Sequence, residues 1–141
     1  MKCNARAPLT RGHALILATA LLACVGLSGA LAADLTLFEG TWRGHWQRTS
    51  GPGTGTSGEL ETTFTVRNNR LEGTHYGITI EKVVVEGRVV QFEHPYQGCR
   101  AYHTFTVDLH DTSRAQSDYR VARCGDPTQD HTGEITYTKK R

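Results

Sequence analysis

Residues 59–75 read ELETTFTVRNNRLEGTH, and this stretch decides the fold. Its first half alternates between inward and outward positions, as in a strand with one buried and one solvated face. The pair Asn68-Asn69 comes next, and asparagine tolerates the positive φ that a two-residue hairpin turn requires. A turn at this pair places Thr62 opposite His75. The sequence therefore predicts an antiparallel hairpin in which His75 points inward.

Similar stretches recur along the chain, and helical periodicity is nearly absent. We expect further strands in the ranges 40–48, 78–94, 100–110, 117–124 and 133–140, with a hairpin turn inside 78–94. The fold class is all-β, an antiparallel up-and-down meander of about eight strands closed into a small barrel, because closure leaves no exposed edge. A two-sheet β sandwich is the alternative.

The hairpin at 78–94 has its expected tip at Glu86-Gly87. A turn with a glycine bulge keeps Val84 and Phe92 on one face, whereas a plain two-residue turn separates them. We therefore expect the bulge, with four side chains of this hairpin inward: Ile80, Val84, Val90 and Phe92.

Residues 1–32 have the pattern of a cleaved signal peptide. A basic start precedes an apolar run at 14–29, and small residues then lead up to Ala32. Cleavage after Ala32 leaves a single domain at 33–141 and predicts export to the periplasm or the extracellular space. The apolar run is short for a membrane span. Alternatively, the stretch ending at Cys24 resembles a lipoprotein box, which would leave Cys24 lipidated.

The charge of the mature domain differs from that of the whole chain. The chain has 16 basic and 14 acidic residues, and three of the bases but none of the acids lie before residue 33. This leaves 13 bases against 14 acids, a net charge of −1. No basic cluster with aromatic residues occurs, apart from the basic tail at 139–141, so we expect no nucleic-acid partner.

Two of the four cysteines, Cys99 and Cys124, lie in the mature domain. A pair of cysteines in a small exported domain predicts one disulfide bond. The two residues flank the hairpin at 100–124, so the bond would join its open end. The chain-entropy model gives such a bond roughly 3 kcal/mol of stabilisation.

The motif Gly40-Thr41-Trp42 opens the first strand, and basic residues end the last one. Together with the meander, this resembles the calycin superfamily of lipocalin-like and avidin-like barrels. In that superfamily the tryptophan closes the barrel floor, and a basic side chain from the last strand packs over it. The resemblance implies that Trp42 is the floor, capped by one of three residues between which the sequence does not choose: Arg141, Lys140 or Lys139.

We expect this barrel to bind a small molecule in its lumen. Gly73 and Gly77 flank His75 on its face and leave space, and a polar side chain in a cavity orients a ligand. The alternative for His75 is a core histidine that is hydrogen-bonded to a neighbour. The candidate ligand-binding residues are His75, Phe64, Leu71, Phe92 and Phe105.

A second hypothesis is an interaction module, such as an inhibitor of a secreted hydrolase. The segment at 94–99 is stiffened by the disulfide, and its candidate partner-binding residues are Tyr96 and His94. A small-molecule binder predicts empty volume in the lumen. An interaction module predicts a filled lumen and an exposed Tyr96.

Nothing in the sequence favours an enzyme, a cofactor or a metal site. The mature serines lie in expected loops outside any Gly-x-Ser-x-Gly motif, and both mature cysteines are assigned to the disulfide. The six mature histidines include no His-x-His pair of the kind that binds a metal on one strand face. An enzymatic function would require several of His75, His94 and His103 to converge with an acid.

Overall fold

The computed structural model describes residues 33–141. The expected signal peptide and the alternative lipidation site at Cys24 lie outside the described residues. Among the described residues, no helix is long and apolar enough to cross a membrane.

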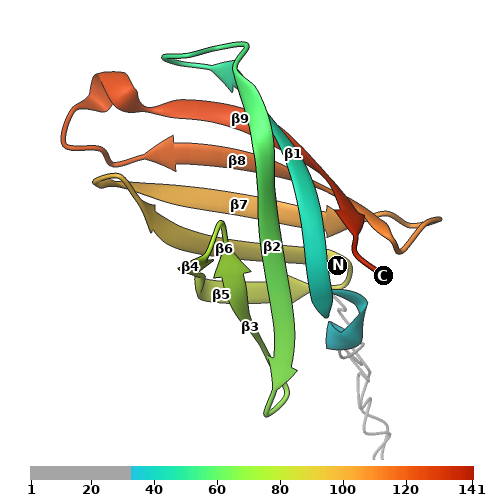
Figure 1. The fold of residues 1–141 in the computed structure, drawn as a ribbon. Coiled ribbons are helices and arrows are strands. Elements are labelled where there is room, and N and C mark those ends of the chain that lie inside the picture. Colours follow the sequence, from blue (N-terminus) through green and yellow to red (C-terminus); the bar gives the residue numbers. More distant parts are fainter. Residues whose placement is uncertain (1–32) are drawn as a thin grey trace, which may run out of the picture. The chain divides into compact units, whose positions relative to one another are not determined.

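The described residues form one antiparallel sheet that curls into a nearly closed barrel (Figure 1). Consecutive strands pair with each other except β4 and β5, and β9 also pairs with β1. The prediction of an all-β antiparallel meander is confirmed. The strands are β1 (Gly40–Ser50), β2 (Ser57–Arg67), β3 (Arg70–His75), β4 (Ile78–Thr79), β5 (Glu81–Glu86), β6 (Val89–Tyr96), β7 (Cys99–Val107), β8 (Arg114–Ala122) and β9 (His131–Lys139), with short 3₁₀ helices η1 (Leu35–Leu37) and η2 (Pro127–Gln129).

The hairpin of β2 and β3 has the register that the sequence predicts. Asn68 and Asn69 adopt φ values of 49° and 58°, the left-handed conformation of a two-residue turn. Thr62 lies opposite His75, and Phe64 lies opposite Gly73. His75 is therefore buried on the inward face.

One seam interrupts the barrel, between the edge strands β4 and β5. The chain crosses it at Ile80, which is buried and donates its backbone N–H to the carbonyl oxygen of Gly73 at 3.1 Å. The seam matters for the site because β3 and β6 approach each other from its two sides.

The expected bulge at the tip of the β5–β6 hairpin is wrong. Glu86 pairs with Val89, so the tip is a plain two-residue turn. The register shift lies instead between Glu81 and Val84. Because the tip is a plain turn, Val84 lies opposite Gln91, faces outward and is 49% exposed, while Val83 and Val85 pack against the core.

The end of the barrel near the start of β1 is closed by aromatic side chains. Trp42 is fully buried, and its indole N–H donates to the carbonyl oxygen of Phe38 at 2.8 Å. The ring of Phe105 meets Trp42 edge-on, with 5.2 Å between centroids. We call Phe38, Trp42, Phe64 and Phe105 the floor.

The basic side chain over the floor is Lys139, not Arg141. Its Nζ lies 5.0 Å from the centre of the Trp42 ring and donates to the carbonyl oxygen of Leu37 at 3.2 Å. Lys139 is the last residue of β9 and pairs with Trp42 on β1, which fixes this contact. Arg141 lies beyond the strand and is exposed.

The predicted disulfide joins Cys99 to Cys124. The two residues flank the paired ends of β7 and β8, and their Cα atoms are 4.1 Å apart. The bond therefore joins the open end of this hairpin, as the sequence predicts. This is the end of β7 that leads into the candidate site.

Candidate functional site

The barrel opens into a cavity at the end opposite the floor. Strand β1 contributes to both ends, because Trp42 and Trp46 lie four residues apart on its inward face. Gly44 lies between them. A Cβ atom at Gly44 would lie 2.7 Å from a ring carbon of Tyr137 and 2.8 Å from a methyl carbon of Leu60. Glycine is therefore required where the two ends of the lumen meet.

The cavity has a volume of about 200 Å³ and a wall of mixed chemistry. Its polar groups belong to four histidines, three tyrosines, Gln97 and Arg48. The apolar part of the wall comes from β1, β2, β7, β8 and β9, through Trp46, Leu60, Ala101, Val121 and Ile135. An apolar wall with a few convergent polar groups is typical of a binding pocket.

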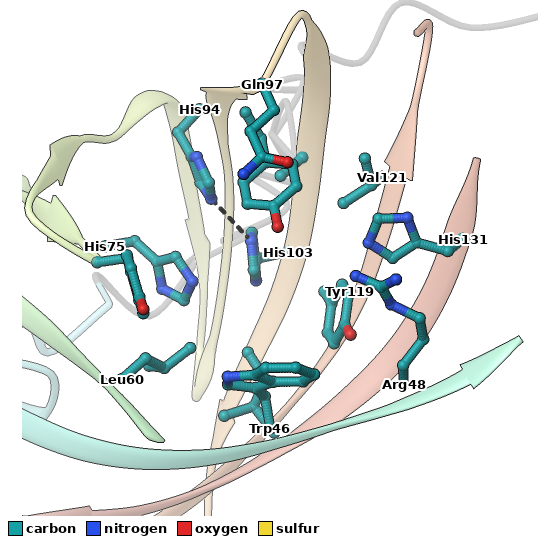
Figure 2. Close-up of a pocket in the computed structure, with 14 residues that line it drawn as sticks. Trp46, Arg48, Leu60, His75, His94, Gln97, His103, Tyr119, Val121 and His131 are labelled. Atoms are coloured by element: carbon teal, nitrogen blue, oxygen red, sulfur yellow. Dashed lines mark hydrogen bonds between the residues drawn. The ribbon is translucent and has the colours of Figure 1, made fainter. Parts of the chain in front are cut away.

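Three buried histidines form the polar centre of this cavity, and we call them the histidine cluster: His75 on β3, His94 on β6 and His103 on β7. Each offers one ring nitrogen, and the three nitrogens lie within 4.8 Å of one another. Figure 2 shows the contact between Nε2 of His94 and Nε2 of His103, at 3.2 Å, with His75 beside them. The cluster bridges the seam, because β3 and β6 are not paired in the sheet.

The hydrogen bonds of the cluster assign the protons on its rings. Nδ1 of His94 lies 2.9 Å from the carbonyl oxygen of Pro95, which can only accept, so this nitrogen carries the proton. In a neutral ring, Nε2 of His94 then accepts the N–H of His103. Nδ1 of His75 contacts the hydroxyl oxygen of Thr62 at 2.8 Å. Within the described part of the chain, Nδ1 of His103 has no hydrogen-bond partner.

Burial keeps the three rings neutral near physiological pH. Desolvation lowers the pKa of His75 to about 3, with a further contribution from repulsion by His94. Desolvation also lowers the pKa of His103 well below its usual value, and both neighbouring histidines add to this effect. Burial lowers the pKa of His94 as well, against the opposing effect of its hydrogen bond to Pro95. Neutral imidazoles offer an unprotonated nitrogen to a ligand or a metal.

The rim of the cavity carries its one guanidinium group. Figure 2 places Arg48 beside Tyr119 and His131. Arg48 donates to the backbone carbonyl of Pro52, and its buried Nε has no hydrogen-bond partner among the described residues. Burial raises the pKa of Tyr119, while Arg48 opposes this shift. The cavity wall thus combines neutral imidazoles with one permanent positive charge.

The five predicted ligand-binding residues are divided between the cavity and the core. His75 lines the cavity. The other four pack in the hydrophobic core below it, so the structure does not bring them to the cavity: Phe64, Leu71, Phe92 and Phe105. The lower lumen is filled because these side chains are large and point toward one another.

Tyr96 does not have the exposed position that the interaction-module hypothesis predicts. Tyr96 is half-buried, and the centroid of its ring lies 6.2 Å from that of His131 and 6.5 Å from that of His94. His94, the other predicted partner-binding residue, is buried in the histidine cluster. Both residues line the cavity, because the last residues of β6 run along its wall.

His103 was named from the sequence only for the enzymatic alternative and not among the ligand-binding residues, although a signal for it was present. It lies two residues before Phe105 on β7, so alternation places it on the inward face. The three histidines that an enzymatic site would need do converge. No carboxylate lines the cavity in the described residues, and the nearby Glu81 and Glu93 pair instead with Arg100.

Comparison with known proteins supports the fold and does not extend to function. No family model matches the chain, and no curated protein matches it. Among solved structures, the chain is similar to EF1p2_mFAP2b bound to DFHBI, with a TM-score of 0.52 and 17% identity. The match covers 78% of this chain and 98% of that chain. The resemblance to a lipocalin-like barrel therefore holds at the level of fold, and membership of the calycin superfamily stays a prediction.

Proposed function

We propose that this chain is an exported, non-catalytic binding protein that takes a small molecule into the cavity above the histidine cluster. The observation that carries the proposal is the cavity itself, about 200 Å³ of open lumen with apolar walls and convergent polar groups. Its opening and the half-buried Tyr96 favour a lumen ligand over the interaction-module hypothesis. EF1p2_mFAP2b, which has a similar fold, is a precedent because its structure holds DFHBI.

The size of the cavity limits the ligand. Drug-sized ligands occupy roughly 300–1,000 Å³, whereas a dry cavity of about 150 Å³ holds benzene. A cavity of about 200 Å³ therefore suits a single substituted aromatic ring. Trp46 and Tyr119 supply aromatic surfaces on the wall against which such a ring can pack.

The charge of the wall suggests that the ligand is acidic. Arg48 is the one lining residue with a permanent charge, and its Nε is a buried donor. A guanidinium group prefers a planar carboxylate as its partner. A small aromatic acid such as benzoate fits both the volume and this donor.

Export is the second part of the proposal. The Cys99–Cys124 disulfide is typical of proteins in oxidising compartments. Together with the signal-peptide pattern of residues 1–32, it supports a mature protein that begins at Ala33. N-terminal sequencing of the protein from the periplasm or the medium tests this start.

Tryptophan fluorescence tests the ligand, because the chain has two tryptophans and they lie at opposite ends of the lumen. We expect benzoate, added in the presence of a chelator, to change the emission of a Trp42→Phe variant, in which Trp46 is the reporter. The emission of a Trp46→Phe variant should change little. Benzyl alcohol serves as the neutral isostere of benzoate.

A matched variant separates charge from shape. Arg48→Gln should weaken benzoate binding about 10-fold or more and leave benzyl alcohol binding nearly unchanged, because it removes a charge-assisted hydrogen bond. Native mass spectrometry of the gently purified protein supplies an independent readout, since a carried ligand adds mass. If neither probe affects Trp46 and no added mass is found, the lumen-ligand proposal is wrong.

A further inference from the structure

We infer that His75, His94 and His103 bind one divalent transition-metal ion of the kind that prefers imidazole ligands, represented by Zn²⁺. This inference goes beyond the proposed ligand and does not depend on it. The sequence predicts no metal site, because the three residues lie on different strands and share no ligand spacing. The barrel brings them together across its seam.

The geometry of the cluster is close to that of a three-histidine site. Zinc–nitrogen bonds of about 2.0–2.1 Å in tetrahedral geometry place two ligand nitrogens about 3.3 Å apart. Nε2 of His94 and Nε2 of His103 are 3.2 Å apart, so this pair already has the separation of two ligands. One nitrogen from each of the three rings lies within 4.8 Å of the other two, and a rotation of the His75 ring can shorten its separations.

Two of the rings present the required lone pair, and His103 presents one at Nε2 once its proton moves to Nδ1. His94 donates from Nδ1 to the carbonyl oxygen of Pro95, which leaves Nε2 for a metal. His75 contacts Oγ1 of Thr62 through Nδ1, which leaves its Nε2 as well. Hydrogen bonds of this kind, from the far nitrogen to a carbonyl or a hydroxyl, orient the ligands in known metal sites.

The surroundings hold these rings in place. Thr62 is fully buried, and its hydroxyl lies 3.5 Å from that of Tyr137. The ring of His103 stacks on Phe92, with 4.7 Å between centroids and 8° between planes. A site on packed strands is better preorganised than one on loops.

The cluster also matches one class of metal in its charge and its access. Neutral imidazoles suit Zn²⁺, Co²⁺, Ni²⁺ and Cu²⁺, whereas Mg²⁺ and Ca²⁺ prefer oxygen ligands. The lining contains no carboxylate among the described residues. Three neutral histidine ligands would therefore leave the positive charge of the bound ion without a compensating negative charge from the protein. A fourth coordination position would face the open cavity, where water or a small anion can enter.

The alternative is a hydrogen-bonded histidine network that binds no metal. In that case the contact between His94 and His103 is one neutral hydrogen bond. Nδ1 of His103 has no partner in the described part of the chain in either case, so it does not distinguish the two. The experiment below separates the two cases.

Calorimetric titration of the chelator-stripped full chain with Zn²⁺ is the first measurement. We expect saturation at one ion per chain and a rise in the midpoint of thermal unfolding, because the ion binds the folded state. Mg²⁺ should give neither effect. Co²⁺ should give the intense visible absorption of a low-coordinate site. If Zn²⁺ gives no saturable binding and no rise in the midpoint, the proposal is overturned.

Glutamine variants then identify the ligands. His75→Gln and His94→Gln should each weaken Zn²⁺ binding about 100-fold or more, since even partners of the ligands contribute 10–100-fold. His131→Gln is the matched control, because His131 lines the same cavity outside the cluster. His45→Gln controls for surface binding, since His45 is exposed and pairs with Glu59. Equal binding by the parent and both cluster variants would assign the metal to the surface and overturn the proposal.

Two further readouts keep the test interpretable. Thermal unfolding in the presence of chelator shows whether each variant is folded. If a variant is not folded, the titration of the parent with Zn²⁺ and Co²⁺ still tests the proposal. Benzoate binding in chelator measures the proposed function separately from the metal. Zinc binding without benzoate binding would support this inference alone, and the reverse result would overturn it while leaving the proposed function intact.

Discussion

The floor and the histidine cluster are built on the same strands, yet they fill the lumen in opposite ways. On β6, the buried Phe92 is followed two residues later by the buried His94. On β7, the buried His103 is followed two residues later by the buried Phe105. All four side chains point inward by alternation. Toward the floor, aromatic rings pack edge to face, whereas at the cluster, imidazoles line an open cavity.

The difference shows what an inward position does and does not determine. At the floor, the only requirements are volume and an apolar surface, and Trp42 places its one polar atom against a backbone carbonyl. At the cluster, three polar rings are buried, and the lining offers them no carboxylate among the described residues. Burial is favourable at the first end, whereas at the second it is unfavourable for Nδ1 of His103, which has no hydrogen-bond partner in the described residues.

The largest expected effect is at the floor. Trp42→Ala should lower the free energy of unfolding by about 3–5 kcal/mol, because it removes a large buried aromatic side chain and leaves a cavity. Urea unfolding measures the loss. Zinc and benzoate binding should be retained in the folded fraction, since the cavity lies at the other end of β1. A variant as stable as the parent would show that Trp42 is not the floor.

A pair of exchanges on β7 compares the two ends directly. Phe105→His places a polar ring in the floor. It should lower the free energy of unfolding by about 3 kcal/mol, because apolar burial is lost and a polar group is left unsatisfied. His103→Phe makes the reverse exchange. In the presence of chelator, the free energy of unfolding of this variant should stay within about 1 kcal/mol of that of the parent. The substitution removes a buried nitrogen that has no partner in the described residues. Urea unfolding of both variants provides the comparison, and equal losses would contradict it.

The smallest expected effect is at the cap of the floor. Lys139→Met should cost about 1 kcal/mol, since it removes a cation over the Trp42 ring and a hydrogen bond to Leu37. Lys140→Met is the matched control and should cost less than about 0.5 kcal/mol, because the Lys140–Glu61 ion pair is exposed. A larger loss in the Lys140 variant, in urea unfolding of both proteins, would reverse the assignment of the cap.

Most of the fold follows from local patterns. The hairpin at 59–75 has the predicted register because the asparagine pair sets the turn and the alternation sets the face. The β5–β6 hairpin is where the sequence prediction fails. The plain two-residue tip puts Val84 opposite Gln91 on the outward face, and the one-residue shift lies within 81–84 instead. Alternation alone does not say where such a shift occurs.

The candidate site follows from local patterns only in part. The register places His75 inward, and the same alternation places His94 and His103 inward beside Phe92 and Phe105. Each inward direction is therefore contained in the sequence of one strand. The meeting of the three rings is not contained in the sequence of any one strand, because no turn or strand pairing connects β3 to β6.

The resemblance to the calycin superfamily implied the role of Trp42 in the floor, and the sequence by itself determined the strands, most of their faces and the disulfide. These depend on neighbours in the chain or on paired neighbours in a hairpin, which local periodicity and turn chemistry specify. Only the tertiary structure decided that Lys139 caps the floor, that the upper lumen stays open and that three histidines converge. These depend on how the barrel closes across its seam, and closure is set by the packing of all the strands together.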